Sequence, residues 1–179
     1  KRYSQCADLL STLNLLPYEG ADDGMELYRE AYLMLALERM KARDYGQALR
    51  SIAASRLRPE NLGAGKPYQE DIDERLADWL EAMCHEELNQ QPQRDAVLNK
   101  IISFKSRGDG VNSLITALAL QKLGKQSEAE ARLNNWISKE PDGSTAQWCL
   151  RVFKGMPVKD PPPDGLSPRV INEWLPMRR

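Results

Sequence analysis

The sequence is short of the residues that most enzyme and metal sites require. It has a single histidine, His85, among 179 residues, and its three cysteines lie far apart. Because no C-x-x-C pair brings two thiols together, neither a zinc site nor a disulfide framework is predicted, and the cysteines are expected to be core thiols. Asn89 stands where a His-Glu-x-x-His zinc motif needs its second histidine, so that motif is incomplete.

Charge of one sign and long apolar runs are also missing. The 25 basic and 26 acidic residues leave a formal net charge of −1, which gives no basic excess for nucleic-acid binding. No apolar run approaches the length that crosses a bilayer. The sequence begins at Lys1, without an initiator Met or a signal-peptide pattern. We therefore expect it to be part of a longer protein, with the compartment, cytoplasm or periplasm, left open.

A phosphate-binding loop is missing too, although Gly63-Ala64-Gly65-Lys66 looks like part of one. A Walker loop needs a glycine five residues before the Gly-Lys pair, a Ser or Thr after it, and a buried strand ahead of it. Here Glu60 replaces the glycine, Pro67 follows the lysine, and residues 48–57 have helical periodicity. No nucleotide and no other cofactor is predicted.

Catalytic carboxylates have a simpler explanation. Asp71, Asp73 and Glu74 offer the acid pair that glycoside hydrolysis uses. Acidic residues in the first turn of a helix are, however, expected from the helix dipole alone. The serines have no histidine other than His85 to activate them. We therefore predict that this chain is not an enzyme.

What the sequence has throughout is helical periodicity, with no run of alternating residues typical of a strand. The pattern predicts eight helices, at 2–14, 22–42, 44–57, 70–90, 92–106, 111–124, 126–140 and 144–154. Capping boxes are predicted at 44–47 and 127–130, and helix stops at Gly124 and 141–143.

A change in composition divides the chain after Gly155. The last 24 residues contain six of the eleven prolines. We predict a helical repeat domain at 1–155 and a proline-rich C-terminal tail at 156–179. The tail is expected to be extended, except for one short helix after Ser167 with Pro168 in its first turn.

Two stretches, 31–60 and 113–141, carry small residues at matching positions. These are Ala36 and Ala48 in the first and Ala117 and Ala129 in the second, all expected to be buried. The pattern resembles a tetratricopeptide repeat, although Arg39 and Arg43 stand where an apolar residue and a glycine are usual. A degraded copy at 80–101 places Cys84 and Ala96 in the small positions. We predict an all-α fold, a short right-handed solenoid of about eight helices in antiparallel, tetratricopeptide-like pairs.

Two longer segments interrupt these units. The motifs 16–20 (LPYEG) and 59–67 (PENLGAGKP) resemble those of a family of large bacterial proteins, in which a β-rich domain of unassigned, loosely carbohydrate-related function precedes helical repeats. The resemblance covers about residues 3–155; it implies that the chain is a C-terminal helical part and assigns no catalytic residue. The candidate functional residues of these inserted loops are Tyr18, Glu19, Asn61, Gly63, Lys66 and Tyr68. Leu62 and Tyr68 are expected to pack on helices, and Gly63 or Gly65 to have a positive φ.

Two functions remain open. The first is a non-catalytic protein-interaction or architectural module, whose partner is a protein segment or the N-terminal domain of the same chain. The second is an accessory helical domain of a carbohydrate-active enzyme, whose inserted loops shape a site on that N-terminal domain.

The predicted partner surface is the concave side of the solenoid, which the first helix of each pair lines. Its candidate residues are Glu30, Leu33, Leu37, Lys41, Asp78, Glu81, His85, Asn89, Leu114, Leu118, Gln121 and Lys122. This surface is apolar at both ends with an acidic patch between them, which suits a peptide or domain carrying a basic residue. In the alternative, the four leucines are core residues that the tail or another helix covers.

Overall fold

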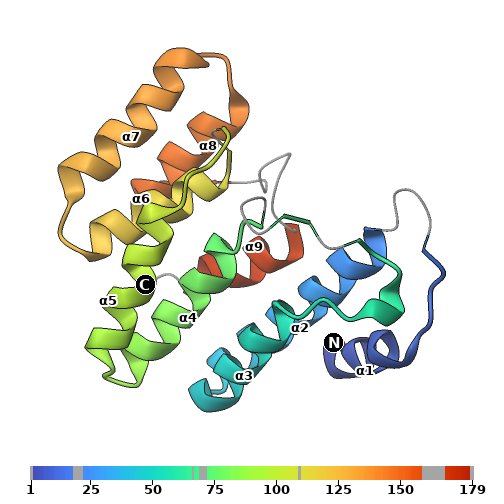
Figure 1. The fold of residues 1–179 in the computed structure, drawn as a ribbon. Coiled ribbons are helices and arrows are strands. Elements are labelled where there is room, and N and C mark those ends of the chain that lie inside the picture. The colour runs from blue at the N-terminus through green and yellow to red at the C-terminus, as the bar shows by residue number, and fades with distance from the viewer. Residues whose placement is uncertain are drawn as a thin grey trace.

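The computed structural model describes residues 2–17, 22–65, 67–68, 72–108, 110–158 and 168–177, and it is all-helical within these ranges, with no strand (Figure 1). The α-helices are α1 (Tyr3–Thr12), α2 (Asp23–Lys41), α3 (Tyr45–Ser55), α4 (Arg75–Glu87), α5 (Gln91–Ser103), α6 (Asn112–Lys122), α7 (Gln126–Lys139), α8 (Ser144–Phe153) and α9 (Pro168–Trp174). Two short 3-10 helices are η1 (Glu60–Leu62) and η3 (Leu175–Met177). All eight predicted helices are present, and α9 is the short helix expected after Ser167.

The two predicted capping boxes have different outcomes. Asp44 caps α3, because its side chain accepts a hydrogen bond from the backbone N–H of Gln47 at 3.2 Å. The second box is wrong. Helix α7 begins at Gln126 with Lys125 at its N-cap, so Ser127 lies inside the first turn and makes no cap.

The turns after α2, α4 and α6 share one backbone conformation. Arg43, Asn89 and Gly124 have positive φ values of 60°, 57° and 76°. At each turn the next residue donates its N–H to a carbonyl five positions back, the pattern of a Schellman motif. The three bonds are Asp44 N–H to Arg39, Gln90 N–H to His85 and Lys125 N–H to Leu120, at 2.8 to 2.9 Å. The glycine missing at position 43 is thus replaced by an arginine in the left-handed conformation.

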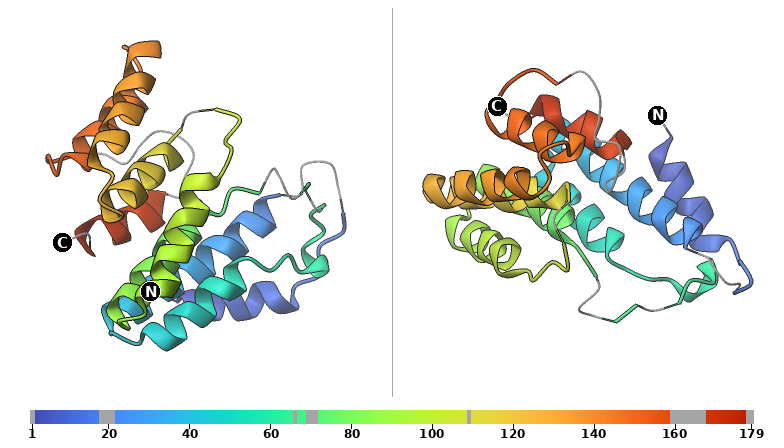
Figure 2. Two further views of the ribbon diagram at one scale, coloured as in Figure 1. Left: turned by 60° about the vertical axis from the view of Figure 1, so that its left-hand side comes forward. Right: turned by 90° about the horizontal axis from the view of Figure 1, so that it is seen from above.

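Neighbouring helices along the chain pack on one another. The pairs α2–α3, α4–α5 and α6–α7 contact closely across these short turns, and α4 and α8 also pack on α6 (Figure 1). Helix α9 lies against α2, far from it in sequence (Figure 2). The main core runs through these helices, and its alanines at 36, 48, 117 and 129 are fully buried, as predicted.

A second, smaller cluster lies between α1, α2 and the segment 59–64. Its buried members are Leu10, Met25, Tyr28 and Leu62. Leu62, on η1, is completely buried, which confirms the prediction that the inserted segment packs on the helices.

Backbone hydrogen bonds and a close approach fix this segment. Leu15 donates its N–H to the Asn61 carbonyl at 2.7 Å, and the Asn61 amide donates to the carbonyls of Leu10 and Leu13. Gly63 has a φ of 69°, and a Cβ there would lie 2.9 Å from the Leu15 carbonyl oxygen, so a glycine is required. The positive φ predicted for Gly63 or Gly65 is therefore found at Gly63.

The prediction for Tyr68 is wrong. Its side chain is 76% exposed. Leu62 and Ala64 provide the apolar contacts of this segment to the second cluster, and Tyr68 lies beyond them in the chain. Tyr18, Glu19 and Lys66, the other candidates in the inserted loops, lie outside the described residues.

Candidate interaction groove

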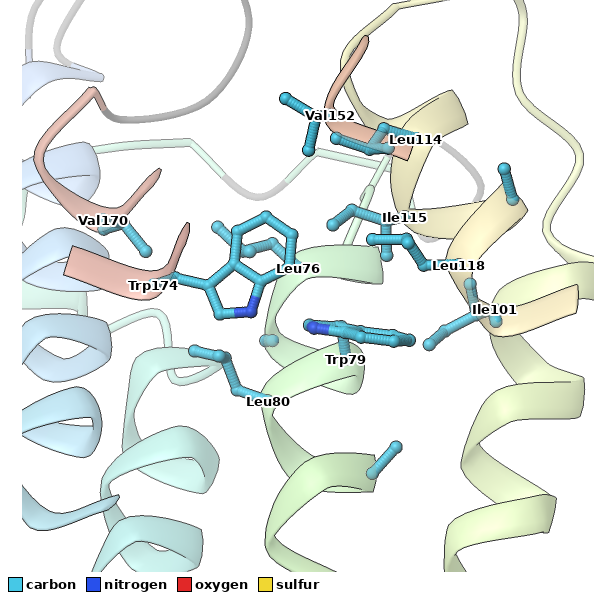
Figure 3. Close-up of a cluster of buried hydrophobic side chains, with 14 of the residues drawn as sticks. Leu76, Trp79, Leu80, Ile101, Leu114, Ile115, Leu118, Val152, Val170 and Trp174 are labelled. Carbon is cyan, nitrogen blue, oxygen red and sulfur yellow. The ribbon is translucent and has the colours of Figure 1, made fainter. Parts of the chain in front are cut away.

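Helix α9 packs on α2 and α4, and it contacts two residues of the predicted partner surface, Glu30 and Lys41. Val170 and Ile171 are fully buried, and Trp174 is 3% exposed. The Trp174 ring packs edge-to-face against Trp79 of α4, with 6.2 Å between ring centroids (Figure 3). Val170 and Trp174 belong to the main core. The tail predicted for 156–179 thus supplies a helix to the core of the domain predicted for 1–155.

Two ion pairs flank these apolar contacts along α2. Arg169 binds Glu30, with 3.2 Å between Nη1 and Oε1, and Glu173 binds Lys41. Glu30 and Lys41 were both predicted as partner-binding residues, and both are engaged by α9. The four side chains are partly exposed, so each pair contributes less to stability than to the position of α9 on α2.

The four leucines of the predicted surface are core residues. Leu33, Leu37, Leu114 and Leu118 are all buried in the main cluster. The alternative therefore holds for them: other parts of the chain cover these side chains, and α9, from the tail, is one of the elements packed on α2.

The shared turn conformation corrects the register of the middle unit. Leu33 precedes Arg43 by ten positions, as Trp79 precedes Asn89 and Leu114 precedes Gly124. The same offset rule makes Ala82, and not Cys84, the equivalent of Ala36. It puts Arg94 at the small-residue position that was predicted for Ala96. The Ala96 side chain is exposed. The prediction was wrong by two residues because it searched for an alanine where this unit has an arginine.

With the corrected register, six side chains occupy equivalent positions on the first helices of the three pairs. We call them the groove residues: Leu33, Leu37, Trp79, Met83, Leu114 and Leu118. All six lie in the main core or pack against it, and Trp79 contacts Trp174 of α9. Trp79 and Met83 were missed from the sequence. The structure reveals them through the turns, since a residue at positive φ follows each of α2, α4 and α6; Arg43 and Asn89, unlike Gly124, do not mark these turns in the sequence.

The predicted acidic patch is an internal charge network. Asp78 is only 3% exposed, and it accepts hydrogen bonds from Arg56 at 2.7 Å and Lys100 at 2.8 Å. Burial raises the pKa of Asp78 more than these two cations lower it. Glu81 also binds Arg56. Asp78 and Glu81 therefore join α3, α4 and α5 and do not form part of the surface on which α9 lies.

The remaining predicted residues are dispersed. His85 shares a hydrogen bond with Gln90, with 2.7 Å between Nδ1 and Oε1, and Asn89 is the left-handed turn residue after α4. The exposed Gln121 donates to Gln126. Lys122 binds both carboxylate oxygens of Glu86, at 2.8 and 2.9 Å. Of these four, Lys122 alone borders the cavity described next.

A cavity of about 230 Å³ opens where α9 and η3 meet the C-terminal ends of α2 and α4. We call it the end cavity. Its lining residues are Met40, Tyr45, Trp79, Met83, Glu86, Glu87, Lys122, Trp174 and Met177. This space lies beside α9, and two carboxylates, Glu86 and Glu87, are among its lining residues.

The described residues contain no group of three or more His, Cys, Asp or Glu side chains placed to hold a metal ion. Burial raises the pKa values of Cys84 and Cys149 to about 12, so both are core thiols with little thiolate at neutral pH. No described helix has the length and apolar character needed to traverse a bilayer.

In comparisons with known proteins, no protein-family model, curated protein or solved structure matches this chain. The fold and the groove are therefore described from their own geometry.

Proposed function

We propose that this chain is a non-catalytic protein-interaction module of tetratricopeptide-like helix pairs, whose groove takes a short amphipathic helix. The observation that carries the proposal is α9. Its Val170 and Trp174 are buried, and its Arg169 and Glu173 pair with Glu30 and Lys41, two of the residues predicted to bind a partner. Helix-in-groove recognition uses this combination of apolar anchors and flanking charges.

The repeated turn supports the repeat architecture in this proposal. In three helix pairs, a residue in the left-handed conformation follows the first helix, and the same hydrogen bonds close the turn. Equivalent positions then supply equivalent groove residues, apolar in all three pairs. Stacked units of this kind produce an extended binding surface on one side.

The proposed partner is a helix similar to α9 in chemistry. It presents a basic residue, an apolar residue next to it, and an acid followed by a tryptophan one turn later, as Arg169, Val170, Glu173 and Trp174 do. The tryptophan is the main anchor because it has the largest apolar area and packs on Trp79. Such a helix belongs to another protein or to an N-terminal part of the same chain.

A peptide-binding experiment tests this proposal. The double variant Val170→Asp/Trp174→Ala places a charge in the α9 interface and removes its anchor; we call it the opened variant. A fluorescent peptide of residues 168–177 is titrated into the opened variant and into the unchanged chain, with fluorescence anisotropy as the readout. A peptide carrying the Trp174→Ala change is the matched control.

The expected result is saturable binding to the opened variant, at least tenfold weaker binding to the unchanged chain, and none of the control peptide. Circular dichroism establishes that the opened variant keeps its helices. Trp174→Ala alone serves as a milder variant if the double change unfolds the chain. Absence of peptide binding by a folded variant would refute the proposed function.

A further inference from the structure

The end cavity has a composition that the apolar groove does not explain. We propose that it is a subsite for a lysine or arginine side chain, presented by the C-terminal end of a helix bound in the groove. The inference rests on the proposed function and adds a sequence preference to it.

The floor of the end cavity suits a long aliphatic stem. Met40 and Met83 contribute thioethers, and Trp79 contributes ring surface; Trp174 belongs to α9, and the tryptophan of a bound helix takes its place. Methionines adapt to side chains of irregular shape, and aromatic rings attract cations through their faces. Lysine and arginine side chains combine such a stem with a cationic end.

The rim of the end cavity is acidic. Glu86 and Glu87 lie in the last turn of α4, where the carbonyl end of the helix dipole also favours a cation. Lys122 pairs with Glu86, and the Tyr45 hydroxyl donates to Glu87 at 3.0 Å. Lys122 therefore offsets one of the two carboxylates. The formal charges of the lining side chains Glu86, Glu87 and Lys122 sum to −1, which opposes an acidic ligand.

An unpartnered donor in the wall of the end cavity is a second, independent feature. Trp79 is 2% exposed, and within the described part of the chain its indole N–H has no hydrogen-bond acceptor. Figure 3 shows the nitrogen of Trp79 on the side of the ring that faces Trp174, another residue of the cavity wall. A buried N–H without an acceptor is costly. The last carbonyls of a bound helix lack intrahelical partners and are acceptors of the kind that this donor needs.

Peptides that differ in one residue test the subsite. Three peptides have the sequence of residues 168–177 extended by lysine, norleucine or glutamate, and each is titrated into the opened variant. Arg178 and Arg179, which follow Met177 in the sequence, are changed to alanine in this protein so that they supply no competing cation. Norleucine keeps the aliphatic stem of lysine and removes the charge.

We expect the lysine peptide to bind about fivefold tighter than the norleucine peptide, and the glutamate peptide to bind weakest. Glu87→Gln should bring the ratio of lysine to norleucine affinities close to one. The matched control is Glu38→Gln, which neutralises an exposed carboxylate on α2 that does not line the cavity and should leave this ratio unchanged.

The possible outcomes separate the two proposals. Equal binding of all three peptides overturns the subsite and leaves the proposed function standing. An equal loss of the lysine preference in Glu38→Gln also overturns the subsite, because the preference then follows net charge. Failure of every peptide to bind, including the peptide of residues 168–177, overturns the proposed function itself.

Discussion

Two segments pack on α2 from outside the regular helix pairs, and they are held in different ways. The segment 59–64 is fixed through its backbone. Leu15 bonds to Asn61, the Asn61 side chain bonds to two carbonyls at the end of α1, and Gly63 allows the chains to approach closely. Helix α9 is held by side chains: two buried apolar residues, one aromatic pair and two partly exposed ion pairs.

This difference distinguishes a segment that is a structural part of the fold from a helix that another helix could replace. Backbone hydrogen bonds and a glycine at positive φ require one particular chain in one particular geometry. Apolar side chains and surface charges on a helix can be supplied equally well by another helix of similar sequence. In the proposed function, the segment 59–64 therefore serves the stability of the fold and the α9 site serves recognition.

The largest effect is expected from Leu62→Ala, which tests the structural insertion. Leu62 is completely buried between α1 and α2, and truncation of such a side chain costs about 3 kcal/mol of the free energy of unfolding. Urea denaturation followed by circular dichroism measures it. A loss below about 1 kcal/mol would show that the segment is not a structural part of the fold.

Trp174→Ala should cost less than Leu62→Ala, although tryptophan is the larger side chain. A buried Trp→Ala change usually costs ~3–5 kcal/mol. If α9 detaches without unfolding the rest, the loss is limited to the free energy that docks α9, which we expect to be about 1–2 kcal/mol. The same urea titration gives the value, and a loss larger than that of Leu62→Ala would make α9 an integral part of the fold.

Two glycines that lie two positions apart, Gly63 and Gly65, form a matched pair. Gly63→Ala should destabilise by about 1 kcal/mol or more, because an alanine at positive φ is strained and its Cβ would meet the Leu15 carbonyl. Gly65→Ala should change stability by less than ~0.5 kcal/mol, since nothing lies within 4 Å of a Cβ there. Thermal melts of both variants measure the difference, and equal effects would remove the special role of Gly63.

The smallest effect is expected from Arg169→Gln. Its ion pair with Glu30 is exposed on the arginine side, so the loss should be below ~0.5 kcal/mol and should shrink further in high salt. Thermal melts at low and high salt measure it. A loss above 1 kcal/mol that salt does not reduce would mean that charge, and not Val170 and Trp174, holds α9.

The sequence predicted most of the fold because helix signals are local. Apolar periodicity predicted where the helices lie, and Asp44 marked the start of α3. Leu62 was predicted to be buried although it lies in an inserted segment. The predicted register of the middle unit was wrong for a local reason as well. Arg94 takes the place of a small residue there, and Asn89 and Arg43 replace glycine at the turns.

The site was harder to predict because it depends on a contact between distant parts of the chain. Glu30 and Lys41 were predicted as partner-binding candidates, but Arg169 and Glu173, which bind them within the chain, were not predicted to do so. Nothing in the periodicity of residues 168–177 indicates which surface their apolar side chains cover. Asp78 and Glu81 look like an exposed patch until Arg56 and Lys100 are placed beside them.

Native-state hydrogen exchange tests the central claim, that α9 occupies an exchangeable site, most directly. Mass spectrometry in increasing, sub-denaturing urea gives the free energy of opening for α9 and for α2 beneath it. We predict that α9 opens at a free energy well below that of global unfolding and nearly independent of urea, while α2 exchanges through global unfolding. Exchange of α9 with the same free energy and the same urea dependence as α2 would contradict the account.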